Sequence, residues 1–170
     1  MLKKQFKDLA KNIQFVVFDF DGVFTDNRVF INEKGEESVV CSRSDGLGLT
    51  RLKQLGLELL ILSSEPNPVV KRRAEKLKIR CIYNCEDKLK VLSREAKRKG
   101  VSLKQAAYMG NDINDAACLK AVGLAVVVAD AHKDVLKSAC YKTRLKGGRG
   151  AVREVCDLIF RAKTERKAYA

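Results

Sequence analysis

The chain alternates between short apolar runs and longer segments in which apolar residues recur every three or four positions. Short runs rich in Val, Ile and Phe are typical of buried strands, and the longer spacing is typical of helices that bury one face. The strands predicted in this way cover residues 15–18, 57–62, 80–83, 106–109, 123–128 and 140–143. The helices predicted between them cover residues 45–55, 68–77, 86–99, 116–120, 130–138 and 151–163.

Residues with special backbone preferences mark the ends of several elements. Gly56 and Gly100 follow predicted helices, as the glycine that ends a helix does. Asn67 and Pro68 have the residue types of an N-cap and of a first helical position. The glycine-rich segment Gly147–Gly150 predicts a flexible hinge before the last helix.

Two further segments extend this pattern. Residues 28–31 and 37–41 flank a loop that contains Gly35, which predicts a β-hairpin. The tail 164–170 is predicted to fray. An amphipathic helix that packs on the body is predicted near the N-terminus from apolar residues at helical spacing, Leu2, Phe6, Leu9 and Ile13.

The predicted fold class is α/β, because strand and helix alternate with short connections. This order is typical of a doubly wound, mainly parallel sheet, here with a hairpin inserted after the first strand. The chain contains no internal repeat, low-complexity segment or linker, and its 170 residues are the usual length of one domain. We therefore expect residues 1–170 to form a single domain.

Composition narrows the class of protein. Hydrophobic residues make up 46% of the chain, which indicates a globular protein. No apolar stretch approaches the roughly 18–20 residues that a membrane span needs. The first residues are charged and lack the apolar region of a secretory signal. We therefore expect a cytoplasmic protein without a membrane partner.

The formal net charge of +13 suggests an anionic partner. Nucleic acid is not expected, because the basic residues are spread over many segments without an aromatic-rich recognition element or zinc-finger spacing. A small, multiply anionic substrate explains the charge equally well. A requirement for solubility alone would also explain the positive charge.

The cysteine and histidine content excludes several kinds of site. None of the six cysteines forms a C-x-x-C pair, and without a secretory signal they are expected to be reduced and mostly buried. His132 is the only histidine. A catalytic triad or a histidine-rich metal site is therefore not expected.

Polar side chains follow the predicted strands at the points where they end, and the carboxyl ends of such strands meet in one crevice. Burying a carboxylate at such a place is costly unless it is paired or binds a metal. The set contains carboxylates, hydroxyls and an amine, as phosphoryl transfer to a carboxylate requires. A simple polar turn is the alternative for residues 19–22. The residues of the set are Asp19, Asp21, Ser63, Ser64, Lys88, Asn111, Asp112 and Asp115.

The chain contains, in this order, D-x-D-G-V-x-T-D, the strand-end serine, the lysine of D-K-L and G-N-D-x-x-D. These segments resemble the motifs of the haloacid dehalogenase superfamily. More narrowly, the chain resembles the branch without a cap domain that dephosphorylates 3-deoxy-manno-octulosonate 8-phosphate and nonulosonate 9-phosphates. The resemblance extends from about residue 13 to residue 160. It includes the segments 43–48, 128–132 and 147–154.

The resemblance implies a Mg²⁺-dependent mechanism and a role for each motif residue. Asp19 is the expected nucleophile and a metal ligand, and Asp21 the expected acid and base, with its carbonyl on the metal. Ser63 and Lys88 are expected to bind phosphate. Asn111 occupies the position of the third metal ligand, where the family usually has aspartate, so weaker metal binding is expected. Two further residues are expected to support this loop or to bind the metal through water, Asp112 and Asp115. The alternative is that they serve only as helix N-terminal charges.

The resemblance also implies substrate contacts. Glu65 replaces an arginine of the octulosonate phosphatases, and together with Lys76 it resembles the nonulosonate phosphatases, so we favour the nine-carbon sugar acid phosphate. A helix cap is the alternative for Glu65, and a solvated helix face is the alternative for Arg73 and Lys76. Other positions that match the substrate pocket, besides Asp21 and Lys88, are Ser42, Arg43, Ser44, Asp45, Gly46 and Arg73.

Relatives of this kind form tetramers, so a homo-oligomer is expected. Two other functions are weighed. A catalytically weak phosphatase-like module that works beside a sialic acid cytidylyltransferase is favoured by Asn111, whereas the presence of Asp19 and Asp21 favours activity. A response-regulator receiver is disfavoured, because receivers carry the phosphate acceptor on a later strand.

Overall fold

Strand β1, Phe15–Phe18, lies in the middle of a six-stranded sheet in the computed structural model, which describes residues 2–165. The strand order is β5-β4-β1-β6-β7-β8, and every neighbouring pair is parallel. The register pairs Phe15 with Glu58 on one side and with Ala106 on the other. The remaining strands are β4 Glu58–Leu62, β5 Arg80–Ile82, β6 Ala106–Gly110, β7 Leu124–Val127 and β8 Tyr141–Lys142.

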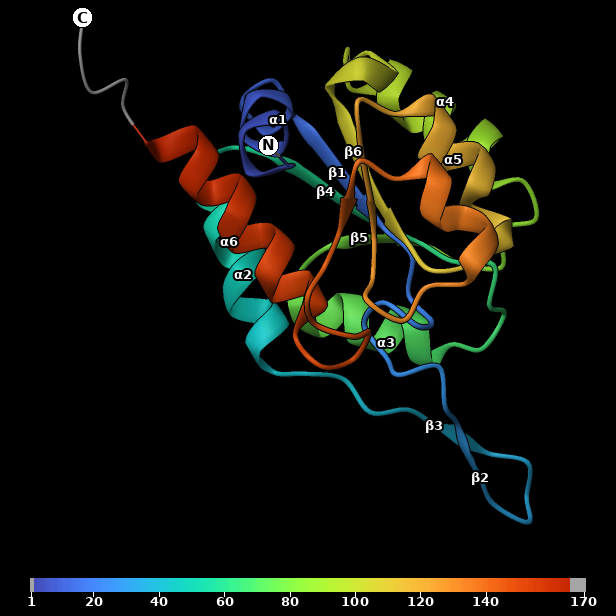
Figure 1. Ribbon diagram of the computed structural model, residues 1–170. Helices are drawn as coiled ribbons and strands as arrows, with labels where there is room; N and C mark the ends of the chain where they lie inside the picture. Colours follow the sequence, from blue (N-terminus) through green and yellow to red (C-terminus); the bar gives the residue numbers. More distant parts are fainter. Residues whose placement is uncertain (1, 166–170) are drawn as a thin grey trace, which may run out of the picture.

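Helices cover both faces of this sheet (Figure 1). Val16 and Phe18 pack in the core under α1, α2, α3 and α6, whereas Phe15 and Val17 pack in the core under α4 and α5. Because both faces are buried, β1 is apolar at every position rather than at every second one. The helices are α1 Leu2–Lys11, α2 Ser44–Gln54, α3 Val69–Leu77, α4 Lys88–Arg98, α5 Ala116–Ala121 and α6 Ala151–Thr164. Three 3₁₀ segments are η1 Leu103–Gln105, η2 Ile113–Asp115 and η3 Lys133–Ser138.

The predicted fold class is confirmed, and most elements begin and end within a few residues of their predicted positions. Helix α3 begins at Val69, one residue later than predicted, although the Asn67 side chain does accept a hydrogen bond from the Val69 amide at 3.0 Å. The helix expected over 130–138 is the shorter 3₁₀ segment η3.

The hairpin between β1 and α2 consists of β2, Phe30–Ile31, and β3, Glu37–Ser38, which pair antiparallel. It extends away from the sheet at the end where α3 lies (Figure 1). Its paired segments are shorter than the predicted 28–31 and 37–41. Large apolar side chains on it remain exposed, including Phe30 at 66% and Ile31 at 63%.

The segment Gly147–Gly150 is packed closely and is not the free hinge that its glycines predicted. A Cβ atom on Gly147 would lie 1.9 Å from the carbonyl oxygen of Gly22. Gly148 donates a backbone hydrogen bond to Val23 at 3.1 Å, and Gly147 donates one to Asp130 at 3.0 Å. These glycines therefore allow α6 to begin directly against the loop that follows β1.

The two ends of the described chain meet on one face of the sheet. Phe6 of α1 is buried against the Tyr141 ring, with 4.8 Å between ring centroids, as the amphipathic pattern predicted. Thr164, the first residue of the tail predicted to fray, still belongs to α6, and Glu165 pairs with Lys7 at 2.7 Å. The rest of that tail, 166–170, lies outside the described residues.

Two further predictions concern the cysteines and the membrane. All six cysteines are free thiols, three of them buried and three partly buried, as expected. Within residues 2–165, no helix is long and apolar enough to cross a membrane.

Candidate active site

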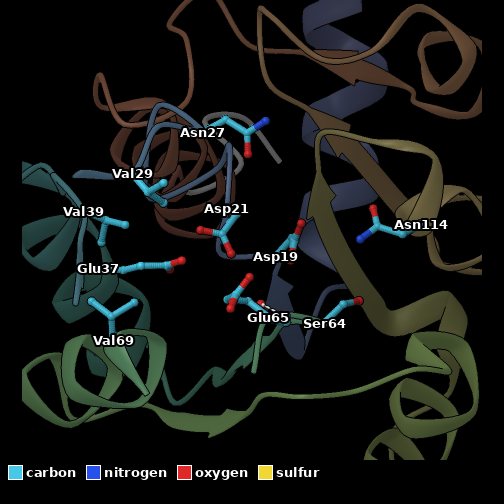
Figure 2. A pocket seen from close by; sticks show the side chains of 11 residues that line it. Asp19, Asp21, Asn27, Val29, Glu37, Val39, Ser64, Glu65, Val69 and Asn114 are labelled. Carbon is cyan, nitrogen blue, oxygen red and sulfur yellow. Dashed lines mark hydrogen bonds between the residues drawn. The ribbon is translucent and has the colours of Figure 1, made fainter. Parts of the chain in front are cut away.

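A cavity of about 310 Å³ opens at the carboxyl ends of β1 and β4, between the sheet and the hairpin. Figure 2 shows Asp19 on one side of this cavity and the carboxylates of Asp21, Glu37 and Glu65 gathered on the other. Its lining residues are Asp19, Asp21, Asn27, Val29, Glu37, Val39, Ser63, Ser64, Glu65, Val69 and Asn114.

Asp19, the first residue after β1, is almost fully buried and pairs with Lys88. The Lys88 ammonium lies 2.8 Å from Asp19 Oδ1 and 2.7 Å from Asp115 Oδ1. Lys88 is the first residue of α4, whose start is fixed by a hydrogen bond from the Lys90 amide to the Asp87 side chain at 2.9 Å. The helix cap therefore places the amine under the end of β1.

Asp115 connects this ion pair to the loop after β6. Besides Lys88, its carboxylate accepts hydrogen bonds from the Tyr108 hydroxyl at 2.7 Å and from the backbone amides of Asn111 at 2.8 Å and Asp112 at 3.3 Å. The Asp112 carboxylate accepts from the Ile113 amide at 2.7 Å, so it caps the turn. A buried carboxylate with four donors is fully satisfied and holds its neighbours in place.

The carboxylates of Asp19 and Asp115 share one ammonium, and this affects the pKa values of Asp19 and Lys88. Burial raises the pKa of Asp19 to about 7, and the charge of Asp115 adds to this effect while Lys88 opposes it. Burial lowers the pKa of Lys88, but Asp19 and Asp115 outweigh it, so that pKa lies above its ordinary value. Lys88 is therefore charged at neutral pH, and a further cation beside Asp19 would favour the ionised carboxylate.

Asp21 lies two residues further on, in a more open position. Burial raises its pKa to about 6, and the nearby Glu65 carboxylate is the second cause. Glu65 accepts a hydrogen bond from the Asn67 amide at 2.8 Å, and its own amide donates to the buried Ser63 hydroxyl at 3.1 Å. Glu65 thus lines the cavity and also caps the turn into α3, so both interpretations of this residue agree with the geometry.

Asn111 provides the test of the expected metal site. Its side-chain oxygen is buried and has no hydrogen-bond partner. The amide lies directly over Gly22, where a Cβ atom would come within 2.1 Å of the Asn111 nitrogen. An unpartnered buried oxygen beside the loop that follows β1 fits a hard cation, which prefers oxygen ligands.

Within residues 2–165, no group of three or more His, Cys, Asp or Glu side chains is arranged to hold a metal. The donor set expected here contains an amide and a backbone carbonyl, so such a group is not required. Asp19, the carbonyl of Asp21 and Asn111 together provide oxygen donors of the kind that Mg²⁺ accepts.

The segment 42–46 and the α3 residues Arg73 and Lys76 do not line the cavity as the sequence predicted. Asp45 is fully buried, and its carboxylate accepts a hydrogen bond from the Arg153 amide at 3.1 Å, so it stabilises the packing of α2 on α6. Arg73 donates to the Ser42 carbonyl at 2.8 Å. Other expected substrate residues outside the lining are the exposed Arg43 and Lys76 and the partly buried Ser42, Ser44 and Gly46.

Several lining residues were not predicted. Four come from the hairpin and its flanks, and two of them, Glu37 and Val39, are two residues apart, as expected for side chains on one face of an extended chain. That alternation was the available signal. Tyr108 was missed because a tyrosine inside an apolar strand is typical of a core position. The unpredicted lining residues are Asn27, Val29, Glu37, Val39, Val69 and Asn114.

Comparisons with known proteins identify the family of this chain. The model of the haloacid dehalogenase-like hydrolase family matches residues 75–153. The 3-deoxy-D-manno-octulosonate 8-phosphate phosphatase KdsC of Yersinia pestis is 38% identical over 155 residues, which cover 91% of this chain and 83% of the relative.

Two solved structures are also similar over most of the chain. The 3-deoxy-D-manno-octulosonate 8-phosphate phosphatase of Moraxella catarrhalis, in complex with magnesium ion, phosphate ion and a KDO molecule, has a TM-score of 0.91 at 35% identity, covering 94% of this chain and 92% of the other. The cobalt-bound phosphatase YrbI of Haemophilus influenzae has a TM-score of 0.87 at 32% identity, covering 91% of each chain. The chain therefore belongs to the haloacid dehalogenase-like hydrolases, and it is a phosphatase of that family.

Proposed function

We propose that this phosphatase is Mg²⁺-dependent and removes phosphate from a 2-keto-3-deoxy sugar acid phosphate, and that it prefers a nonulosonate 9-phosphate to 3-deoxy-manno-octulosonate 8-phosphate. The observation that carries the proposal is the buried pair of Asp19 and Lys88 at the wall of a cavity that also contains Asp21. The names of the relatives KdsC and YrbI support the class of substrate.

Three oxygen donors would hold Mg²⁺: the Asp19 carboxylate, the Asp21 carbonyl and the Asn111 side chain. The metal would supply positive charge that offsets the charges of Asp19 and the phosphate. The magnesium ion in the complex of the Moraxella catarrhalis phosphatase supports this choice. Because Asn111 is neutral, we expect weaker binding than with a carboxylate.

In the first half of the reaction, an Asp19 carboxylate oxygen attacks phosphorus and the bond from phosphorus to the sugar oxygen breaks. Asp21 donates its proton to that leaving oxygen, which departs as an alcohol. Its pKa is raised to about 6, so a minor fraction of Asp21 carries this proton near neutral pH, far more than for an ordinary aspartate. Lys88 and the Ser63 hydroxyl bind the phosphoryl oxygens, and Lys88 holds Asp19 in position.

In the second half, water attacks the phosphorus of the Asp19 acyl phosphate. Asp21, now ionised, accepts a proton from that water, and the bond from phosphorus to the Asp19 oxygen breaks. Inorganic phosphate leaves, and both carboxylates return to their starting forms. The cycle needs Asp19 ionised and Asp21 protonated, whereas the pKa of Asp19 (about 7) lies above that of Asp21 (about 6). A cation bound beside Asp19 would favour its ionised form and so reverse this order.

The preference for the nine-carbon substrate rests on Glu65. A carboxylate at this wall accepts hydrogen bonds from hydroxyl groups and repels the carboxylate of the sugar acid, so it favours the polyol chain over the acid end. Glu65 lies in the cavity lining beside Asp21, close enough to raise its pKa.

We also propose a homo-oligomer, with a tetramer as the expected form, because the hairpin exposes Val29, Phe30, Ile31 and Val40. The second candidate function, a catalytically weak module beside a cytidylyltransferase, is favoured by the amide at Asn111.

Phosphate release with Mg²⁺ tests the proposal. We expect a higher kcat/KM for the nonulosonate 9-phosphate than for the octulosonate 8-phosphate, and loss of both activities with a chelator. Preference for the 8-phosphate would contradict the role given to Glu65. No release from either substrate by a folded oligomer would favour the module instead.

A further inference from the structure

The far wall of the cavity is assembled from two elements that are linked through Asn67. The Asn67 side-chain amide donates to Glu37 of β3 at 3.0 Å, and its backbone amide donates to Glu65 at 2.8 Å. Its side-chain oxygen accepts from Val69 at the start of α3 at 3.0 Å. One residue therefore contacts the hairpin, the loop after β4 and α3.

The Asn67–Glu37 bond has no substitute in the described chain. Within residues 2–165, it is the only hydrogen bond that joins the hairpin 28–41 to the rest of the protein, and no ion pair joins them. The other side-chain bonds of the hairpin remain inside it, such as Asn32 to Glu36 at 2.8 Å. Val39 and Cys41 also pack against the core, so Asn67 provides the one polar contact in the described residues that fixes the Glu37 carboxylate in the cavity.

The charge of this wall indicates what it binds. The described cavity lining contains four carboxylates and no Lys or Arg. Asp19 and Asp21 serve the phosphate, which leaves Glu37 and Glu65 for the rest of the substrate. Each of these glutamates uses one carboxylate oxygen for Asn67. Carboxylates repel an anionic group and accept hydrogen bonds from hydroxyls.

Apolar side chains complete the same wall. Val29, Val39 and Val69 line the cavity beside the two glutamates, as Figure 2 shows. Hydrogen-bond acceptors beside apolar contacts suit a polyol chain, which presents hydroxyl donors and C–H surface together. The acid end of the substrate would be repelled from this wall.

We propose that Glu37 is a specificity-determining residue that binds hydroxyl groups of the sugar acid next to its phosphate, and that Asn67 is the positioning residue that holds Glu37 against Glu65. This inference rests on the proposed substrate class. It adds the hairpin of the same chain to the substrate subsite, which the motif residues do not include.

The variants Glu37→Gln and Asn67→Asp test the two roles separately. Glu37→Gln keeps an acceptor for Asn67 but replaces the other carboxylate oxygen by a donor. Asn67→Asp keeps the shape and the acceptor for the Val69 amide, and aspartate is a good residue at a helix start, but it can no longer donate to Glu37. Asn32→Ala is the matched control, because it removes an asparagine–glutamate bond of the same hairpin away from the cavity.

The readout is the ratio of kcat/KM for the nonulosonate 9-phosphate to kcat/KM for p-nitrophenyl phosphate, which has no polyol chain, measured on the full chain with Mg²⁺. We expect this ratio to fall about tenfold in Glu37→Gln and Asn67→Asp, mainly through a higher KM for the sugar substrate. We expect no change in Asn32→Ala, and thermal unfolding of Asn67→Asp close to that of the wild type.

Two results separate this inference from the proposed function. If the wild type cleaves both substrates and the ratio is unchanged in Glu37→Gln or Asn67→Asp, the role of the hairpin wall is overturned while the function stands. If the wild type cleaves p-nitrophenyl phosphate but not the sugar acid phosphate, the substrate class is wrong and the subsite falls with it.

Discussion

The two sides of the cavity are built differently. On one side, Asp19, Lys88, Asp115 and Tyr108 are almost completely buried, and Asp115 accepts four hydrogen bonds. On the other side, the carboxylate of Asp21 has no hydrogen bond within the described residues, and those of Glu37 and Glu65 receive bonds only from Asn67. The first side is organised before substrate arrives, and the second keeps acceptors free for it.

The contrast separates the chemistry from the selection of substrate. The buried side has the groups that transfer phosphate, and its geometry depends on strand ends and helix starts of the sheet. The open side depends on a hairpin attached by one hydrogen bond. Changes on the buried side should therefore affect turnover and stability, and changes on the open side should affect substrate preference.

The largest effect is expected for Asp19→Asn. Removing the nucleophile should lower turnover at least about a thousandfold. The protein should stay folded, because burial already disfavours the charge of Asp19. Phosphate release and thermal unfolding measure the two effects, and turnover within tenfold of the wild type would exclude Asp19 as nucleophile.

Asp115→Asn should disrupt the hydrogen bonds of the buried side, although Asp115 does not line the cavity. It leaves Lys88 with one carboxylate instead of two, so we expect a loss of about 3 kcal/mol in the free energy of unfolding and a fall of roughly a hundredfold in turnover. Tyr108→Phe is the milder matched variant, since it removes one donor and should cost about 1 kcal/mol. Urea unfolding and phosphate release check both. Equal effects of the two variants would contradict the central place of Asp115.

Asn111→Asp should strengthen Mg²⁺ binding. A carboxylate in place of the amide should lower the half-saturating Mg²⁺ concentration by roughly tenfold, because Mg²⁺ binds charged oxygen ligands more tightly. Mg²⁺ titrations of both activity and thermal stability measure this, with Asn111→Ala expected to shift the same midpoint upward. An unchanged midpoint in both variants would remove Asn111 from the ligand set.

The smallest effect on activity is expected at Asp45, a buried carboxylate outside the cavity, where the prediction concerns stability. Burial raises its pKa from 3.8 to about 6, although bonding to the Arg153 amide and the charge of Arg73 oppose this. Between these pH values the folded chain binds more protons than the unfolded chain, so the free energy of unfolding falls as pH rises from about 4 to 6. Asp45→Asn should remove this part of the slope, at most about 3 kcal/mol. Urea titrations measure the free energy of unfolding of the wild type and of Asp45→Asn at pH 4.5 and pH 7. The same change between the two pH values in both proteins would contradict the raised pKa of Asp45.

How far the site could be predicted depends on the range of the interactions involved. Asp19, Ser63 and Lys88 were placed near one another from local patterns, because the ends of parallel strands meet at one edge. The hairpin was also predicted, but its orientation was not, since that depends on the contact between Glu37 and Asn67.

Two other positions show the same limit. Asp45 matches a substrate-pocket motif, yet its partner Arg153 lies 108 residues further along the chain, and only the folded structure brings α6 over it. The glycines at 147 and 148 predicted flexibility, whereas the structure uses their missing side chains for close packing on Gly22 and Thr25. A flexible hinge and a closely packed turn can therefore have the same glycine-rich sequence.

The most direct test of the proposed mechanism is to find the phosphorylated residue. The full chain is mixed with Mg²⁺ and the nonulosonate 9-phosphate, quenched with acid during turnover, and treated with borohydride, which reduces an acyl phosphate to an alcohol. We predict conversion of Asp19 to homoserine in the peptide that contains it, with none in Asp19→Asn. Active turnover with Asp19 unmodified, or with the label on another residue, would contradict the mechanism.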